Sequence, residues 1–119
     1  MGQPVVQWQI LSRNPEAHSS FYAQLFDWNI QSNNPLGYRM ADPGNDRGIP
    51  GGFWPAPPEA KPFVQLFIEV EDMDATIAQA TKLGGAVLLP PQNLPGGEAM
   101  AILRDPEGLT FGIYRPARL

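Results

Sequence analysis

Val6-Gln7-Trp8-Gln9-Ile10 and Val64-Gln65-Leu66-Phe67-Ile68 follow one alternation of side chains, at an offset of 58 residues. A period of two predicts a β-strand at each place. A residue that favours a helix start follows each strand at the same offset, Asn14 before Pro15 in the first case and Asp72 in the second. The chain is therefore expected to contain the same folding unit twice.

The far ends of the two copies also correspond. GIPGGFW at 48–54 matches GLTFGIY at 108–114 at an offset of 60 residues. Each copy then predicts the order β-α-β-β-β. We expect an α+β fold in which the two repeats form a curved mixed sheet trough with helices outside. One domain covers 1–119, with repeats at about 4–55 and 63–116 and a linker at 56–62.

The expected elements follow from periodicity and from Gly, Pro, Asn and Asp breaks. Strands or extended segments are expected at 5–11, 28–31, 37–41, 49–54, 63–70, 86–89, 99–103 and 109–114. The first helix runs through Phe26 and is expected to carry an apolar stripe of Ala17, Phe21, Tyr22 and Leu25. The second helix carries Met73, Ile77 and Ala80 and stops at Gly84-Gly85. Strand 63–70 is expected to place Val64, Leu66, Ile68 and Val70 on one face, and PPQNLPGG at 90–97 is interpreted as a loop.

Composition narrows the function classes. The 119 residues are 43% hydrophobic and 17% charged, which is ordinary for a soluble globular domain. A net charge of −4 without a basic cluster argues against nucleic acid and anionic membrane as partners. No cysteine is available for a disulfide, a thiol nucleophile or a thiolate-bound metal. The first residues lack a signal-peptide pattern and no apolar run is long enough to span a membrane, so a cytoplasmic protein is expected.

The order of elements and several motifs resemble the vicinal-oxygen-chelate superfamily, which includes glyoxalase I, bleomycin-resistance proteins and extradiol dioxygenases. The resemblance covers essentially the whole chain. It is carried by VVQWQI at 5–10, SSFYAQLFDW at 19–28, FIEVEDMDATIAQATKLGGAVL at 67–88 and RDPEGLTFGIYRP at 104–116. It implies that the protein is a homodimer.

The resemblance also implies four metal-ligand positions, one on the first and one on the last strand of each repeat. These positions fall on Gln7, Gln65, Gly52 and Gly112. Glycine has no side-chain ligand, and a neutral amide oxygen is a weaker donor than imidazole or carboxylate. We therefore expect no catalytic metal and no other cofactor.

Strand parity predicts which side chains share the face of those four positions. The predicted ligand-binding residues are Gln7, Gln9, Gly52, Trp54, Gln65, Phe67, Glu69, Gly112 and Tyr114. Such a surface of amides, one carboxylate and aromatic rings suits a small organic molecule, and the glycines would deepen the pocket. Glu69 is the candidate proton acceptor.

Each of these residues also has a structural interpretation. Gln7 and Gln65 could hydrogen-bond each other, and the three aromatic side chains could be core or interface. Gly51-Gly52 could be a bulge, and Glu69 an exposed strand-end residue. The only histidine, His18, is expected in solvent, without a neighbour that orients it.

Three hypotheses for function remain open at this point. The first is a metal-free binding protein of the bleomycin-resistance type that holds a small hydrophobic or aromatic metabolite. The second is a lyase, isomerase or dioxygenase of the same superfamily with a rewired site that uses Glu69. The third is an interaction module whose trough is filled by its own side chains.

Overall fold

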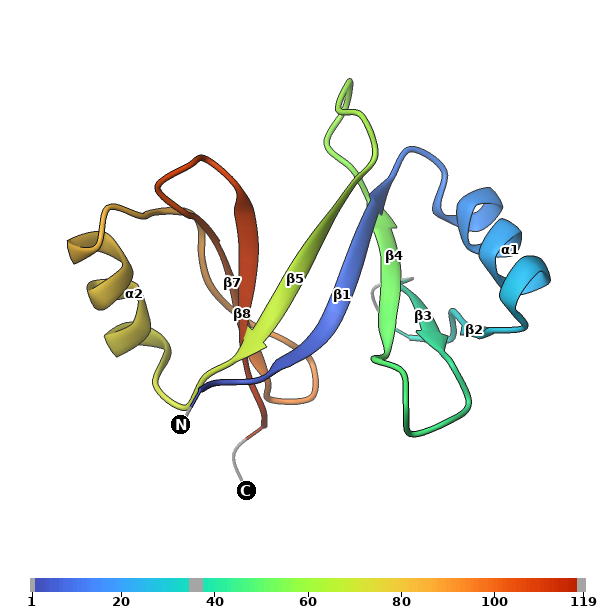
Figure 1. The fold of residues 1–119 in the computed structure, drawn as a ribbon, viewed down its shortest axis with the longest axis horizontal. Helices are drawn as coiled ribbons and strands as arrows, with labels where there is room; N and C mark the ends of the chain where they lie inside the picture. The colour runs from blue at the N-terminus through green and yellow to red at the C-terminus, as the bar shows by residue number, and fades with distance from the viewer. Residues whose placement is uncertain (1, 35–37, 118–119) are drawn as a thin grey trace. The chain divides into compact units, whose positions relative to one another are not determined.

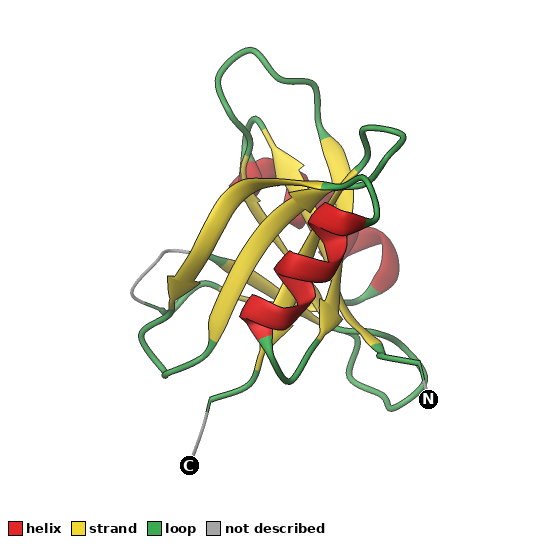
Figure 2. Cartoon of the chain, turned by 90° about the vertical axis from the view of Figure 1, so that its left-hand side faces the viewer, coloured by secondary structure: helices red, strands yellow, loops and turns green. Residues whose placement is uncertain are grey.

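The computed structural model describes residues 2–34 and 38–117 (Figure 1). Its elements are β1 (Val5–Ser12), α1 (Pro15–Phe26), β2 (Asn29–Gln31), β3 (Arg39–Asp42), β4 (Gly51–Pro55), β5 (Phe63–Glu69), α2 (Met73–Lys82), β6 (Ala86–Asn93), β7 (Ala99–Arg104) and β8 (Thr110–Arg115). This order is β-α-β-β-β twice, so the predicted α+β fold with two repeats is confirmed. Figure 2 shows the strands in yellow and the helices in red. No helix among the described residues is long and apolar enough to cross a membrane.

The chain divides into two compact units, and the strand pairing is mixed in each. The first unit is Val6–Gln65, and the second is Met1–Val5 together with Leu66–Leu119. In the first unit the strand order is β2-β3-β4-β1, with β1 parallel to β4 and the other pairs antiparallel. In the second unit the order is β5-β8-β7-β6, with β5 parallel to β8 and the other pairs antiparallel. The two units thus repeat one arrangement of strands.

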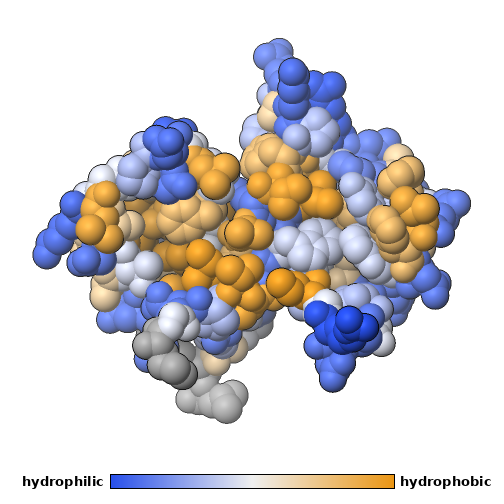
Figure 3. Space-filling view, viewed as in Figure 1, coloured by the Kyte–Doolittle hydropathy of each residue, from blue (hydrophilic) through white to orange (hydrophobic). Residues whose placement is uncertain are grey.

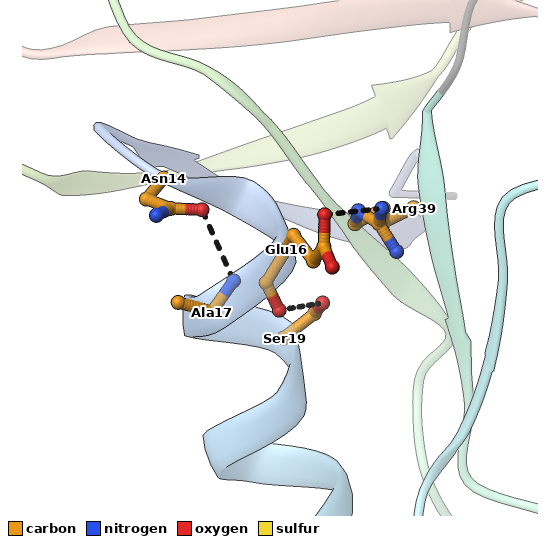
Figure 4. A network of polar contacts seen from close by, with 5 residues as sticks. All are labelled: Asn14, Glu16, Ala17, Ser19 and Arg39. Carbon is orange, nitrogen blue, oxygen red and sulfur yellow. Dashed lines mark hydrogen bonds and ion pairs between the residues drawn. The ribbon is translucent and has the colours of Figure 1, made fainter.

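The predicted helix starts are confirmed by their capping bonds. The Oδ1 atom of Asn14 accepts from the backbone N–H of Ala17 at 3.1 Å, and Pro15 begins α1 (Figure 4). The Oδ1 atom of Asp72 accepts from the N–H of Ala75 at 3.0 Å in the same way. These bonds satisfy N–H groups that have no partner within the helix.

An ion pair also ties the first turn of α1 to β3. The Glu16 carboxylate lies 3.5 Å from the Arg39 guanidinium (Figure 4). The Glu16 side chain is largely exposed, so this pair contributes little to stability. The positive charge of Arg39 is therefore paired with a carboxylate on α1.

The predicted apolar stripe of α1 is wrong in part. Phe21 and Leu25 are each 59% exposed, and orange atoms mark α1 at the right of Figure 3. Tyr22 of the predicted stripe does face inward and stacks on Trp28 at 5.5 Å between ring centroids, and Ser19, which was not predicted, is buried beside it. Two apolar side chains therefore face solvent because a small hydroxyl and an aromatic ring fill the space between helix and sheet.

His18 does not lie free in solvent, so that prediction is also wrong. It is half-buried, and its Nδ1 atom lies 2.9 Å from the Oγ atom of Ser12, at the end of β1. Its ring also lies 5.5 Å from that of Phe53. Ser12 accepts from the N–H of Asn14 as well, so this bond network fixes the start of the helix on the sheet.

The second unit has an aliphatic core between α2 and its strands. Val70, Met73, Ala99, Ala101, Leu103 and Ile113 form it, with Ile77, Ala80 and Phe111 packed against them. The predicted apolar residues of α2 therefore face inward. The helix ends at Lys82, and Gly84 has a φ of +96°, a conformation that favours glycine and confirms the predicted stop.

The faces of β5 differ from the prediction at the start of the strand. Val64 and Leu66 are 55% and 48% exposed, whereas Gln65 and Phe67 are buried. Orange atoms gather over β5 in Figure 3. Helix α2 contacts β6 and β8, which leaves this face of β5 uncovered at its start. Only at Val70, just after the strand, is the predicted apolar face buried.

The segment predicted as a loop at 90–97 begins as a strand. β6 continues to Asn93, and Gln92 and Asn93 pair with Met100 and Ala99 of β7. β6 is the last strand in its order and shifts its register twice along β7. An edge strand tolerates Pro90 and Pro91 because one of its sides needs no N–H donors.

Candidate functional site

The candidate site of the first unit lies on the face of β1 and β4 that points away from α1. Trp8 points toward the helix layer, where its ring lies 5.3 Å from Trp28. Alternation along β1 then directs Gln7 and Gln9 to the other face. The register pairs Gln9 with Gly52 and continues without a shift, so the interpretation of Gly51-Gly52 as a bulge is wrong.

Two glycines of β4 make room for two aromatic rings on opposite faces. A Cβ atom on Gly51 would lie 2.1 Å from the Trp8 ring, on the helix side. A Cβ atom on Gly52 would lie 2.5 Å from Cζ and 2.6 Å from the hydroxyl oxygen of Tyr38, on the site face. The space left by Gly52 is therefore filled by the chain's own tyrosine, and this glycine does not deepen a pocket.

Tyr38 is held in place from several directions. Asn34 clamps its backbone, because Asn34 Oδ1 accepts from the Tyr38 N–H at 2.9 Å and Asn34 Nδ2 donates to the Tyr38 carbonyl. Its ring meets that of Trp54 edge to face, with 4.8 Å between centroids. The ring is thus fixed over Gly52 and beside Trp54.

A network of amides surrounds the Tyr38 phenol. Gln7 Nε2 donates to the phenol oxygen at 3.4 Å, and Gln65 Nε2 donates to Gln9 Oε1 at 2.7 Å. The sequence interpretation paired Gln65 with Gln7, whereas this bond joins Gln65 to Gln9 and Gln7 donates to Tyr38. Burial raises the pKa of Tyr38 above 10.0, and the smaller effect of its hydrogen bond with Gln9 lowers that pKa. The phenol is consequently neutral at physiological pH.

We name this group the amide–phenol cluster. Its members are Gln7, Gln9, Tyr38, Gly52, Trp54 and Gln65, all in the first unit. None of these side chains carries a charge at neutral pH. The prediction from sequence missed Tyr38. Tyr38 lies two residues before Met40, and only the register of β3 on β4, with Met40 opposite Gly52, shows that it shares their face.

The remaining predicted residues lie together in the second unit. Phe67 pairs with Gly112 and Glu69 with Tyr114 on the parallel strands β5 and β8. A Cβ atom on Gly112 would lie 2.4 Å from the Phe67 ring, so this glycine too is covered by an aromatic side chain. Phe67 is buried, in agreement with its interpretation as a core residue, whereas Glu69 and Tyr114 are half-buried.

Tyr114 has an anionic environment, in contrast to Tyr38. Burial raises the pKa of the Tyr114 phenol, and the nearby carboxylates of Glu98 and Glu69 raise it further. The Glu69 backbone N–H donates to the Pro4 carbonyl at 2.9 Å, which holds the end of β5. This part of the second unit could accept or exchange a proton through a carboxylate that faces a phenol.

The four positions implied by the resemblance do not fit a divalent transition metal. Gln7 is bonded to Tyr38, and Gln65 is bonded to Gln9. Gly52 and Gly112 supply no donor, and aromatic rings occupy the space where a longer side chain would extend. The set contains no imidazole and no carboxylate, which are the oxygen and nitrogen ligands that bind such ions well. Among the described residues, no three His, Asp or Glu side chains are grouped so that they could hold an ion.

Two open hollows of the surface lie elsewhere. The first is lined by Ala17, Ser20, Phe21, Gln24 and Leu25, on the outer side of α1. The second is lined by Gln31, Met40, Ala41, Asp42 and Pro50. Neither hollow includes a residue of the predicted site.

Comparison with known proteins places this geometry in a family. Residues 7–114 match the model of the glyoxalase-like domain. "Putative glyoxylase CFP32" of Mycobacterium bovis and of Mycobacterium tuberculosis is 29% identical over 112 residues, which are 92% of this chain and 42% of the relative. The chain thus spans about two-fifths of the length of these curated relatives.

Solved structures share the fold at low identity. Methylmalonyl-CoA epimerase from Mycobacterium tuberculosis has a TM-score of 0.67 at 14% identity, over 96% of this chain and 88% of that one. The hypothetical protein BH1468 from Bacillus halodurans has a TM-score of 0.71 at 12% identity, over 100% and 98% of the two chains. The match of the family model over most of the sequence, together with the repeated β-α-β-β-β order, shows that the chain belongs to the glyoxalase-like domain family of the vicinal-oxygen-chelate superfamily.

Proposed function

We propose that this chain is a metal-free small-molecule-binding protein of the glyoxalase and bleomycin-resistance type, and that its ligand contacts the amide–phenol cluster. The observation that carries the proposal is the replacement of metal ligands by neutral groups. Gln7 and Gln65 are engaged in hydrogen bonds, and Tyr38 and Phe67 cover Gly52 and Gly112. Few polar groups beside aromatic rings are typical of sites for small organic ligands.

The chemistry of the cluster favours an uncharged ligand. An anion such as a carboxylate or phosphate needs a cationic side chain or several N–H donors that converge on it. Arg39 is next to Tyr38 in sequence, but its guanidinium is paired with Glu16 at α1. The aromatic edge of Trp54 and the phenol of Tyr38 instead suit a ring-bearing molecule with one polar atom.

Ligand binding can be tested with backbone amide NMR spectra of the isotope-labelled protein during titration with small aromatic compounds. We expect saturable shifts of the Trp54 indole N–H and of the Gln7 and Gln9 side-chain amides. The Trp28 indole, which packs with Trp8 on the helix side, is the internal control and should not shift. Shifts of Trp28 without shifts of Trp54 would refute the proposed face.

A second candidate is an enzyme, a lyase, isomerase or dioxygenase-like protein with a rewired site. The observation that favours it is the pairing of Glu69 with Tyr114, near Glu98, in the second unit. A carboxylate beside a phenol can remove and return a proton next to a carbonyl group. Deuterium incorporation from D₂O into methylmalonyl-CoA and into small α-hydroxy ketones would detect this chemistry. A rate that is equal in Glu69→Gln, Glu107→Gln and the unsubstituted protein would exclude a role for Glu69.

We also infer that the protein forms a homodimer. Val64, Leu66, Phe21 and Leu25 are apolar and about half or more exposed, and every residue of the edge strand β6 is exposed. Such apolar side chains and an unpaired strand edge are typical of surfaces that associate.

A further inference from the structure

We propose that the Tyr38 hydroxyl donates a hydrogen bond to a carbonyl oxygen of the ligand and thereby selects neutral carbonyl compounds. This assignment rests on the proposed binding function and adds the class of ligand to it. Tyr38 is not among the residues predicted from the sequence. We infer a carbonyl ligand because the phenol oxygen already accepts a hydrogen bond within the protein, so the phenol offers a ligand its hydroxyl hydrogen.

The phenol oxygen receives the hydrogen bonds recorded at this group. A tyrosine hydroxyl has one hydrogen to donate and two lone pairs that accept. Gln7 Nε2 donates to the oxygen at 3.4 Å. Gln9 uses its Oε1 to accept from Gln65 Nε2, so its own amide nitrogen is the atom that can donate to the phenol. Among the residues that the structure describes, no acceptor is recorded for the hydroxyl hydrogen itself, so this hydrogen is left for an acceptor on the ligand.

The same bonds make the phenol a better donor. A hydroxyl whose oxygen receives N–H bonds is polarised, because the hydrogen bonds in a chain strengthen one another. Burial keeps the group protonated at neutral pH, since it raises the pKa of Tyr38. The hydroxyl can therefore donate over the whole physiological range.

The surroundings fix the direction of that donor. The ring cannot tilt toward the sheet without contacting Gly52, and Trp54 blocks one edge at 4.8 Å. The Asn34 clamp holds the Tyr38 backbone on both of its polar groups. A rigid donor beside an aromatic edge recognises a carbonyl that is attached to an apolar body, such as an aryl ketone, amide or ester.

The absence of charge in the cluster separates this class from carboxylates. Gln7, Gln9, Gln65 and Tyr38 are all neutral at pH 7, and each amide already has a partner within the cluster. A carboxylate would lose water here without gaining a cation, which is costly. A neutral ketone loses much less hydration free energy than a carboxylate when it leaves water for this site, and it gains a hydrogen bond from Tyr38.

The test compares three probes of one shape: acetophenone, ethylbenzene and benzoate. Each is titrated into the full chain and followed by the Trp54 indole signal in NMR spectra. We expect acetophenone to bind about two- to twelvefold more tightly than ethylbenzene, the range for one neutral hydrogen bond. We expect benzoate to bind more weakly than acetophenone.

Variants then assign the preference to Tyr38. Tyr38→Phe should bind acetophenone and ethylbenzene equally, while Tyr22→Phe, on the helix side, should keep the preference. Gln7→Met leaves the phenol but removes one of its donors, so a reduced preference is expected. Gln7→Met therefore tests the role of the phenol even if Tyr38→Phe does not fold.

The outcomes distinguish the two proposals. Equal binding of acetophenone and ethylbenzene to the unsubstituted protein, with Trp54 shifted by both, would overturn the role of Tyr38 and leave the binding face intact. A preference that survives in Tyr38→Phe would overturn it as well. Tighter binding of benzoate would overturn the neutral ligand class. If no probe shifts Trp54, the binding face itself is refuted.

Discussion

Gly52→Ala is the substitution whose effect follows most directly from the packing of Tyr38. The new Cβ atom would lie 2.5 Å from Tyr38 Cζ, whereas carbon atoms are in favourable contact at about 3.5 Å. The ring must then move by about 1 Å, the difference between these distances. Because Asn34 and Trp54 hold it, we expect overpacking to cost about 1–3 kcal/mol of unfolding free energy.

The size of the thermal effect can be estimated from chain length. With an unfolding entropy of about 2.1 cal/mol/K per residue, 119 residues give a fall in Tm of about 4 °C per kcal/mol. Gly52→Ala should therefore lower Tm by about 4–12 °C if the cost is about 1–3 kcal/mol. Gly2→Ala is the matched control, because nothing lies within 4 Å of the added atom.

A double-mutant cycle decides whether Tyr38 causes the effect. In a Tyr38→Ala background the clash is absent, and Gly→Ala in an ordinary strand conformation is expected to be neutral or to stabilise by up to about 1 kcal/mol. The assay is urea unfolding followed by far-UV circular dichroism, with all four proteins measured together. An equal cost of Gly52→Ala in both backgrounds would refute the proposed packing of Tyr38 over Gly52.

Three further predictions concern the second unit, pH and assembly. Gly112→Ala should cost about 2–4 kcal/mol in urea unfolding, at the upper end of overpacking effects, because the Phe67 ring 2.4 Å away is buried; a neutral effect would contradict this. Because burial raises the pKa of Tyr38 above 10.0, the contribution of Tyr38 to the unfolding free energy should be constant below pH 10 and should fall as pH rises through the folded pKa. In Tyr38→Phe the loss of stability above pH 10 should be smaller than in the unsubstituted protein. Identical profiles of Tm against pH for the two proteins between pH 8 and 11 would argue against this role of Tyr38. Light scattering at micromolar concentration should give the mass of a dimer, and Leu66→Glu should shift it toward the 13.1 kDa monomer; a monomeric unsubstituted protein would contradict the inference.

The repeat and its helix starts could be predicted from sequence because they depend on local chemistry. Asn14 and Asp72 cap their helices through bonds that span three residues, and Gly84 ends α2 by its own backbone conformation. Alternation along β1 correctly separated Trp8 from Gln7 and Gln9. These features need no knowledge of the tertiary contacts.

The errors arose where a contact distant in sequence decides burial. Phe21 and Leu25 have helical spacing but face solvent, because Ser19 and Tyr22 fit the space against the sheet. Likewise β5 buries Gln65, whose amide has a partner 56 residues away in Gln9, and exposes Leu66. The spacing of apolar residues predicts which face of an element is hydrophobic, but it does not predict which other element packs against that face.

The sequence predicted that Gln7, Gln9 and Gly52 share one face, but it did not predict how the side chains around them pack. The four positions implied by the resemblance fall on paired strands, with Gln9 opposite Gly52 and Phe67 opposite Gly112. The rings that cover both glycines could not be predicted, since a glycine in a strand is equally compatible with an open pocket. Tyr38 enters the site through the register of β3 on β4, which the sequence does not specify.

Calorimetric titration of the chelator-treated protein with Zn²⁺, Ni²⁺ and Mn²⁺ tests the central claim, that this duplicated site works without a metal, most directly. Gln7→Met and Gln65→Met are titrated in parallel as variants that remove the two amide oxygens. We predict no saturable binding of any ion that depends on these residues, because the four positions offer two engaged amides and two covered glycines. Saturable binding of one ion per chain that is lost in both variants would contradict the account.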